Sequence, residues 1–167
     1  MKTILFSLLM LFFVTDVAAQ KTLDTLLDQY NTRSVPYISV AELKMQMMSG
    51  EVAVLDAREY EEFAVSHLPS ATFIGYSTFS SEEITASLLD KDQPIVVYCS
   101  LGIRSEVIGE KLKKAGYTNV RNLYGGIFEW KNKDFSVLDM NGNESENVHV
   151  CSKMWSKWLT KGNKVYR

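Results

Sequence analysis

The sequence predicts an α/β fold in which a five-stranded, mainly parallel sheet carries helices on both faces. Short, continuous apolar runs, as in residues 52–56 and 95–98, are typical of strands that are buried on both sides. Segments with helical periodicity separate these runs. Because strands that alternate with helices indicate a parallel sheet, the chain is expected to build one such domain over residues 37–134.

The expected strands and helices alternate along this domain. The predicted strands cover residues 37–39, 52–56, 71–74, 95–98 and 120–123, and a helical pattern follows each of them. Ser39 and Ser80 are each followed three residues later by a glutamate, and this capping-box sequence begins the first and third helices. Gly50 ends the first helix, and the pair Gly125-Gly126 allows a turn before the last one.

The first 36 residues differ from the rest of the chain. Residues 1–19 contain Lys2, an apolar run of about eleven residues and small residues at 17–19, a pattern typical of a secretory signal peptide. The run is shorter than the roughly 20 residues of a spanning helix, so we expect cleavage rather than an uncleaved anchor. No stable membrane span is then expected, and the protein would be exported, either periplasmic or secreted. Residues 20–36 are expected to form a helical lead-in.

Residues 135–167 are expected to form a C-terminal extension. Its first part, residues 139–147, is polar and is predicted to be a surface loop or linker. Apolar residues then recur at helical spacing and predict an amphipathic helix; they are Cys151, Met154, Trp155, Trp158 and Leu159. This helix would either pack against the domain or bind a partner or a membrane surface.

Charge and cysteine content limit the classes of function. The chain has 18 basic and 20 acidic residues, and a net charge of -2 gives no basic surface for nucleic acid. Two cysteines are too few for a disulfide scaffold, although a Cys99–Cys151 bridge remains an alternative. His67 and His149 lie far apart, and the sequence has neither Cys-x-x-Cys nor a phosphate-binding glycine loop. No metal or cofactor is therefore expected.

The segment 95–105 contains the strongest candidate for chemistry. An apolar strand ends at Cys99, a short loop follows, and a helix begins. Backbone N–H groups in such a loop and at a helix N-terminus stabilise an anion, so a cysteine here is expected to be a thiolate. The expected anion-binding loop consists of Ser100, Leu101, Gly102, Ile103, Arg104 and Ser105. Gly102 would let the loop curl, and Arg104 could hold an anionic substrate.

Five separated motifs give the chain its resemblance to a known family. They are Leu55-Asp56-Ala57-Arg58, Glu62-Phe63, His67-Leu68-Pro69, the loop from Cys99 to Ser105, and Leu123-Tyr124-Gly125-Gly126-Ile127 with Trp130. Together they resemble a single-domain rhodanese, a sulfurtransferase, of the exported bacterial type. The resemblance implies that Cys99 takes sulfane sulfur from a small anionic donor such as thiosulfate, mercaptopyruvate or a polysulfide, becomes a persulfide, and passes the sulfur to a thiol or cyanide.

The other candidate residues leave alternatives open. Asp56 and Arg58 would either form an ion pair that supports the loop or contact the substrate. Glu62 and His67 are expected to be structural, with a catalytic acid or base as the alternative for His67. Cys151 is expected to pack as a small core or interface residue, with a resolving thiol as the alternative. Apolar Leu101 and Ile103 argue against a small, highly charged donor.

Two other functions compete with sulfur transfer. Cysteine phosphatases and arsenate reductases also use a thiolate and an arginine, but phosphatases place five residues between them. Here four residues separate Cys99 from Arg104, and the shorter loop disfavours a tetrahedral phosphate. The second alternative is a non-enzymatic module that carries sulfur or binds a protein partner.

Overall fold

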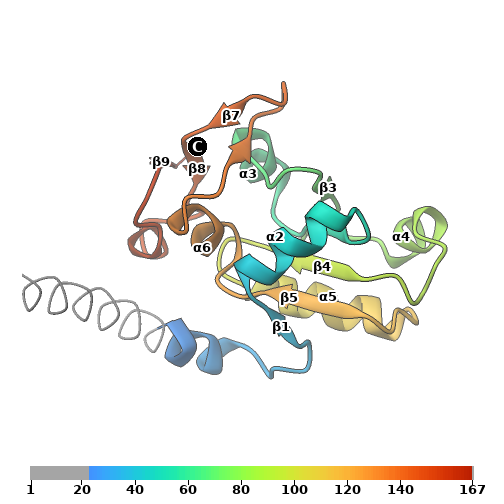
Figure 1. Ribbon diagram of the computed structural model, residues 1–167. Coiled ribbons are helices and arrows are strands. Elements are labelled where there is room, and N and C mark those ends of the chain that lie inside the picture. The colour runs from blue at the N-terminus through green and yellow to red at the C-terminus, as the bar shows by residue number, and fades with distance from the viewer. Residues whose placement is uncertain (1–22, 167) are drawn as a thin grey trace, which may run out of the picture. The chain divides into compact units, whose positions relative to one another are not determined.

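The computed structural model describes residues 23–166 and has a parallel sheet at its centre (Figure 1). Within the described residues, this sheet consists of five strands: β1 (Tyr37–Ile38), β2 (Ala53–Asp56), β3 (Thr72–Phe73), β4 (Ile95–Tyr98) and β5 (Val120–Leu123). Their order is β1-β5-β4-β2-β3, and every neighbouring pair is parallel. The predicted five-stranded sheet is confirmed, with each strand within two residues of its expected bounds.

Helices cover both faces of this sheet. They are α2 (Val40–Ser49), α3 (Tyr60–Val65), α4 (Ser81–Ser87), α5 (Arg104–Lys114) and α6 (Gly126–Asn132). Ile84 of α4 and Ile108 of α5 pack with alternate strand residues such as Leu55 and Val97 in one core cluster. Figure 1 shows α2 across the opposite face from α5. The β-branched and leucine residues of the strands therefore meet apolar helix faces on both sides.

The capping sequence at Ser39 folds as predicted. The Ser39 hydroxyl accepts a hydrogen bond from the Glu42 N–H at 3.2 Å, and the Glu42 carboxylate accepts one from the Ser39 N–H at 3.0 Å. Gly50 then ends α2 with a φ of 74°, a left-handed conformation that glycine adopts without a Cβ clash. Local sequence alone thus sets both ends of this helix.

The register of the sheet aligns the strand ends that carry the candidate residues. Asp56, the last residue of β2, pairs with Tyr98, the last residue of β4. Cys99 therefore follows directly at the edge where Asp56 lies. Ligands of parallel sheets bind at this carboxyl edge, so the topology puts the cysteine where a substrate can approach.

The N-terminal segment is a separate compact unit that extends to Thr32. Residues 23–30 are helical, as expected for the lead-in. The predicted signal peptide, residues 1–19, lies outside the described residues. Among residues 23–166, no helix combines the length and the apolar character needed to span a membrane.

The C-terminal extension consists of short strands and turns. The strands β6 (Val137–Leu138) and β7 (Glu144–Ser145) form an antiparallel pair, so the expected linker is mostly a hairpin turn. The strands β8 (Asn147–His149) and β9 (Asn163–Val165) form a parallel pair. Leu138 also bridges to His67, which joins the extension to the main domain.

The predicted amphipathic helix at the C-terminus is wrong. Residues 151–159 form turns and one short 3-10 helix, η1 (Ser156–Trp158). Cys151 has a left-handed φ of 60°, which no α-helix contains. The side chain of Asn132 in α6 accepts hydrogen bonds from the N–H groups of Thr160 and Lys161 and holds the segment in place. A nine-residue pattern is too short to form a stable helix alone, so these tertiary contacts decide its conformation.

The buried face of α5 should contribute strongly to stability. Ile108 is fully buried, whereas its neighbour Val107 is 39% exposed. Ile108→Ala is expected to lower the free energy of unfolding by about 2–5 kcal/mol, since it leaves a cavity in the core. Val107→Ala, the control on the same helix, should change it by less than about 0.5 kcal/mol. Urea denaturation measures both, and equal effects would contradict this packing.

Candidate active site

Cys99 lies in a tight loop between β4 and α5. Its Sγ accepts a hydrogen bond from the Gly102 N–H at 3.1 Å, and the Ser105 Oγ lies 3.5 Å away. Gly102 has a φ of 104°, and a Cβ there would meet the Leu123 carbonyl oxygen at 3.3 Å. The loop therefore needs glycine at this position in order to point the Gly102 N–H at the sulfur.

The surroundings of Cys99 favour the thiolate. Burial by itself raises the pKa of the Cys99 thiol, because the side chain is only 2% exposed. The positive charge of Arg104 and hydrogen bonds from Ser105 and Leu101 outweigh this effect, so the pKa lies below its ordinary value. A buried thiolate held by fixed donors is a competent nucleophile.

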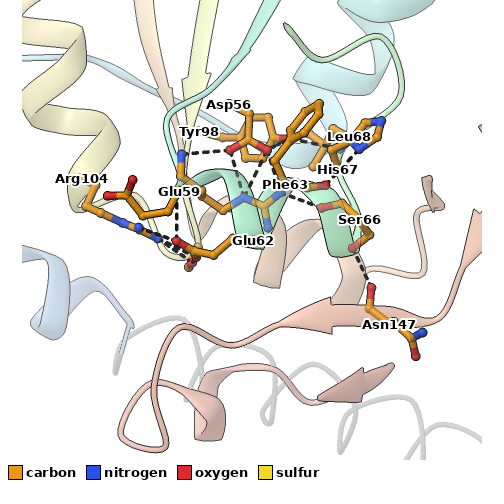
Figure 2. Close-up of polar contacts among 12 residues, drawn as sticks. Asp56, Glu59, Glu62, Phe63, Ser66, His67, Leu68, Tyr98, Arg104 and Asn147 are labelled. Atoms are coloured by element: carbon orange, nitrogen blue, oxygen red, sulfur yellow. Dashed lines mark hydrogen bonds and ion pairs between the residues drawn. The ribbon is translucent and has the colours of Figure 1, made fainter. Parts of the chain in front are cut away.

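Arg104 is held by a carboxylate from another element. Both terminal nitrogens of its guanidinium donate to Glu62 of α3, at 2.6 and 2.8 Å, and one of them also donates to the Ser100 hydroxyl at 3.0 Å (Figure 2). Ser100 in turn donates to Glu62 at 3.0 Å. Burial raises the pKa of the Glu62 carboxyl, and the hydrogen bonds and charge of Arg104 lower it further than burial raises it. The predicted role of Arg104 as an anion holder stays a prediction, since Glu62 occupies two of its N–H groups.

The side chain of Asn122 in β5 forms hydrogen bonds to the loop and to the first turn of α5. Its amide nitrogen donates to the Gly102 carbonyl at 2.8 Å and to Glu106 at 3.1 Å. Its amide oxygen accepts from the Ser105 hydroxyl at 2.7 Å. Sequence reasoning missed this residue, although an asparagine inside an otherwise apolar strand is a signal, because a fully buried amide needs hydrogen-bond partners.

The N-terminus of α6 fixes the start of the loop. The N–H groups of Ile127 and Phe128 donate to the carbonyls of Cys99 and Ser100, at 2.9 and 3.2 Å. Gly126 has a φ of 55°, and a Cβ there would lie 2.2 Å from the Cys99 carbonyl oxygen. The sequence indicated only a turn at this glycine; its close approach to the cysteine backbone is a structural finding.

Asp56 and Arg58 form a buried ion pair, which is one of the two roles expected for them. Arg58 Nη2 lies 2.6 Å from the Asp56 carboxylate, and both side chains are fully buried. Arg58 also donates to the Ser66 carbonyl, and the Tyr98 hydroxyl donates to Asp56 (Figure 2). Burial and the Asp56 charge raise the pKa of the Tyr98 hydroxyl, which therefore stays neutral. The network ties β2, β4 and the end of α3 together next to the loop.

Comparison with known proteins identifies the family of this α/β domain. The family model described as Rhodanese-like domain matches residues 39–133, more than half of the chain. The chain belongs to this family. In the curated relative named putative sulfur carrier protein YrkF, from Bacillus subtilis, 33% of 104 residues are identical, which covers 62% of this chain and 55% of that protein. This chain thus spans about half the length of that relative.

Solved structures agree with this assignment. The human single-domain sulfurtransferase TSTD1 is 26% identical, with a TM-score of 0.51 over 60% of this chain and 98% of that one. The thiosulfate sulfurtransferase from Pseudomonas aeruginosa shares the fold at 18% identity, with a TM-score of 0.60 over 75% of this chain and 23% of that one. The homologues of this rhodanese-like domain thus include sulfur carriers and sulfurtransferases.

The remaining predicted residues of the rhodanese-like domain lie in and around the same loop. Leu101 is buried, and Ile103 is the residue before α5. His67 stacks on Phe63 with ring centroids 4.2 Å apart, which fits its expected structural role. Cys151 is exposed and both cysteines are free, so Cys151 is not the core residue that was one of its two expected roles, and its role at an interface stays a prediction. Its left-handed backbone holds it out of the core. Within residues 23–166, no three His, Cys, Asp or Glu side chains form a candidate metal site.

The pKa of Cys99 should lie below that of an ordinary thiol, and the pKa of Cys151 should lie above it. The pKa of Cys99 is lowered, as above. Although Cys151 is exposed, partial desolvation by neighbouring atoms and the charge of Glu62 raise the pKa of its thiol. Since only thiolates are alkylated, the rate at Cys99 should reach half its maximum at a lower pH than the rate at Cys151. Iodoacetamide labelling across pH, read by peptide mass spectrometry, measures both midpoints. Arg104→Ala should raise the Cys99 midpoint, and an unchanged midpoint would contradict the role of its charge.

The buried Asp56–Arg58 pair should matter for stability and not for thiol reactivity. Asp56→Asn leaves the Arg58 charge without its partner and is expected to lower the free energy of unfolding by about 3–5 kcal/mol. The pH midpoint of Cys99 alkylation should stay as in the unmodified chain, because neither residue contacts the sulfur. Denaturant titration and the labelling assay provide the two readings. A shifted midpoint with unchanged stability would mean that the pair acts on the site directly.

Proposed function

We propose that this protein is a sulfurtransferase in which Cys99 carries sulfane sulfur as a persulfide. One observation supports this most directly: the Cys99 sulfur lies among N–H and O–H donors, which include the Gly102 N–H at 3.1 Å, and the pKa of the Cys99 thiol is lowered. A thiolate prepared in this way attacks a sulfur atom that carries a good leaving group. The relatives with sulfur-carrier and sulfurtransferase names support the same chemistry.

The reaction would proceed in two displacements. The Cys99 thiolate attacks the outer sulfur of the donor, a new S–S bond forms, and the bond from that sulfur to the rest of the donor breaks. The remainder leaves with the electron pair, as sulfite from thiosulfate, as a thiolate or shorter polysulfide from a polysulfide, or as the enolate of pyruvate from mercaptopyruvate. An acceptor thiolate, or cyanide, then attacks the outer sulfur of the persulfide, and Cys99 leaves as a thiolate. The low pKa of Cys99 assists the second step, because a stabilised thiolate is a better leaving group.

The Arg104–Glu62 pair bears on the class of donor. Glu62 places a negative charge against the guanidinium, so the pair offers a compact dianion such as thiosulfate less attraction than an unpaired arginine would. Polysulfides and organic persulfides carry less charge per sulfur atom. We therefore propose polysulfide-type donors ahead of thiosulfate, in agreement with the apolar Leu101 and Ile103.

A sulfur carrier that does not turn over is the second candidate. The observation that favours it is the depth of Cys99, which is 2% exposed and so is shielded from bulky acceptors. The two candidates differ in turnover: an enzyme passes sulfur repeatedly to a small thiol or to cyanide, and a carrier releases it once to a partner.

A donor panel with intact-mass detection tests the proposed function. Purified protein is incubated with tetrasulfide, thiosulfate or mercaptopyruvate, and a persulfide at Cys99 is expected to add about 32 Da, which cyanide removes. Cys99→Ser should not gain this mass at residue 99. Thiocyanate release over many cycles would distinguish an enzyme from a carrier. An unchanged mass with every donor would rule out sulfur transfer through Cys99.

A further inference from the structure

Glu106, in the first turn of α5, is a buried carboxylate that the proposed sulfur transfer does not use. Its side chain is only 3% exposed, and a buried carboxylate is costly unless its oxygens accept hydrogen bonds. Oε1 accepts one from the Ser34 N–H at 2.9 Å, and Oε2 accepts one from the Asn122 amide nitrogen at 3.1 Å. Glu106 therefore bridges the segment before β1 to the strand β5, whose Asn122 holds the Cys99 loop.

The Glu106 carboxylate determines which way the Asn122 amide faces. A carboxylate accepts hydrogen bonds and cannot donate them, so the amide nitrogen must face Glu106 and the amide oxygen must face away. In this direction the same nitrogen donates to the Gly102 carbonyl at 2.8 Å, and the oxygen accepts from the Ser105 hydroxyl at 2.7 Å. A reversed amide would place its oxygen against the carbonyl oxygen of Gly102, where the two oxygens repel each other. Because Asn122 is fully buried, water does not take the place of these partners.

Both groups that Asn122 holds lie against the Cys99 sulfur. Gly102 donates its N–H to Sγ at 3.1 Å, and the Ser105 hydroxyl lies 3.5 Å from the same atom. The N–H and the carbonyl of Gly102 belong to the two peptide groups that flank one Cα, so a fixed carbonyl restricts the direction of the N–H. The amide of Asn122 is thus the only residue between Glu106 and the two groups that contact the sulfur.

The segment before β1 anchors the other end of the bridge. Besides its N–H bond to Glu106, Ser34 donates its hydroxyl to Glu110, one turn further along α5, at 2.5 Å. The Pro36 carbonyl accepts a hydrogen bond from the backbone N–H of Asn122 at 2.9 Å. This short segment therefore binds the Glu106 side chain and the Asn122 backbone, and the bond between those two residues closes a ring. Neither of them can move without breaking one of these hydrogen bonds.

We propose that Glu106 is a positioning residue for Cys99 and that it acts through the Asn122 amide. The carboxylate fixes the amide, and the amide fixes the Gly102 and Ser105 groups that lie against the sulfur. The inference rests on the proposed function, since sulfur transfer uses the thiolate that these groups stabilise. A glutamine of the same size cannot replace Glu106, because its NH₂ group would face either the Ser34 N–H or the amide nitrogen of Asn122.

The pH dependence of Cys99 alkylation in the full chain tests this role. In Glu106→Gln the bridge breaks on one side, and the midpoint is expected to rise by about half a pH unit or more, because a poorly aligned hydrogen bond stabilises the thiolate less. The lost charge by itself would act in the opposite direction, since removal of a nearby negative charge favours the thiolate and lowers the midpoint. The sign of the shift therefore separates positioning from a simple charge effect. An unchanged or lowered midpoint would overturn the inference.

Glu110→Gln is the matched control. It removes the same charge from the same helix and a second partner of Ser34, but Glu110 accepts the Ser34 hydroxyl, whereas Glu106 accepts the Asn122 amide. Its midpoint should not rise, and a rise equal to that of Glu106→Gln would contradict the specific role of Glu106. If Glu106→Gln does not fold, Glu106→Asp takes its place. This variant keeps the charge, is one methylene too short for the bridge, and should also raise the midpoint.

Asn122→Ala shows whether Glu106 acts through the amide. This variant should raise the midpoint by itself, and the addition of Glu106→Gln should then cause no further rise. If the two rises add, Glu106 acts by another route and the inference is wrong. Loading of Cys99 by tetrasulfide, read by intact mass, separates this result from the proposed function. If Cys99 loads but the Glu106→Gln midpoint does not rise, the proposed function stands without this inference. If the midpoint rises but Cys99 never loads, Glu106 orders the thiolate and the proposed function is wrong.

Discussion

The ion pair between Arg104 and Glu62 joins the three segments on which the site depends. Arg104 begins α5, Glu62 lies in α3, and Ser100 bonds to both from within the cysteine loop. A buried thiolate needs positive charge nearby to offset its desolvation, and Arg104 supplies it. Glu62 keeps the guanidinium in place, but its negative charge weakens the positive potential that Arg104 produces at the sulfur. The position of α3 against the sheet therefore determines how strongly the thiolate is stabilised, although α3 contributes no group to the sulfur itself.

Because Glu62 offsets part of the Arg104 charge, the backbone N–H groups of the loop stabilise negative charge more selectively than Arg104 does. The field of an ion pair falls off faster than that of a single charge, so the pair attracts a distant anion weakly. The N–H groups of the loop act at hydrogen-bond distance and favour charge at one point, the Cys99 sulfur. Asn122 and the N-terminus of α6 hold the loop carbonyls, and this fixes where the N–H groups point. The carbonyls of Cys99, Ser100 and Gly102 are all bonded in this way, which holds the loop in one conformation.

The sequence predicted those features that local pattern determines. Apolar runs placed the five strands, Ser39 and Gly50 placed the ends of α2, and the strand-to-helix loop indicated Cys99. Asn122 and Gly126 were missed as site residues because their partners lie 16 or more residues away in the chain. No local pattern shows that Gly126 must approach the Cys99 carbonyl. Such contacts follow from the order of strands in the sheet, which periodicity does not specify.

The error in the C-terminal extension has the same origin. Parallel strands such as β8 and β9 need a crossover of about a dozen residues, and the segment with helical periodicity is that crossover. Strand pairing and the hydrogen bonds of Asn132 determine the path of this segment. Its apolar residues therefore do not form one face of a helix. In a helix, Cys151 would have pointed into an apolar stripe. The left-handed turn at Cys151 leaves the side chain exposed instead, so the long-range contacts that set the path of this segment also decide which of its residues are buried.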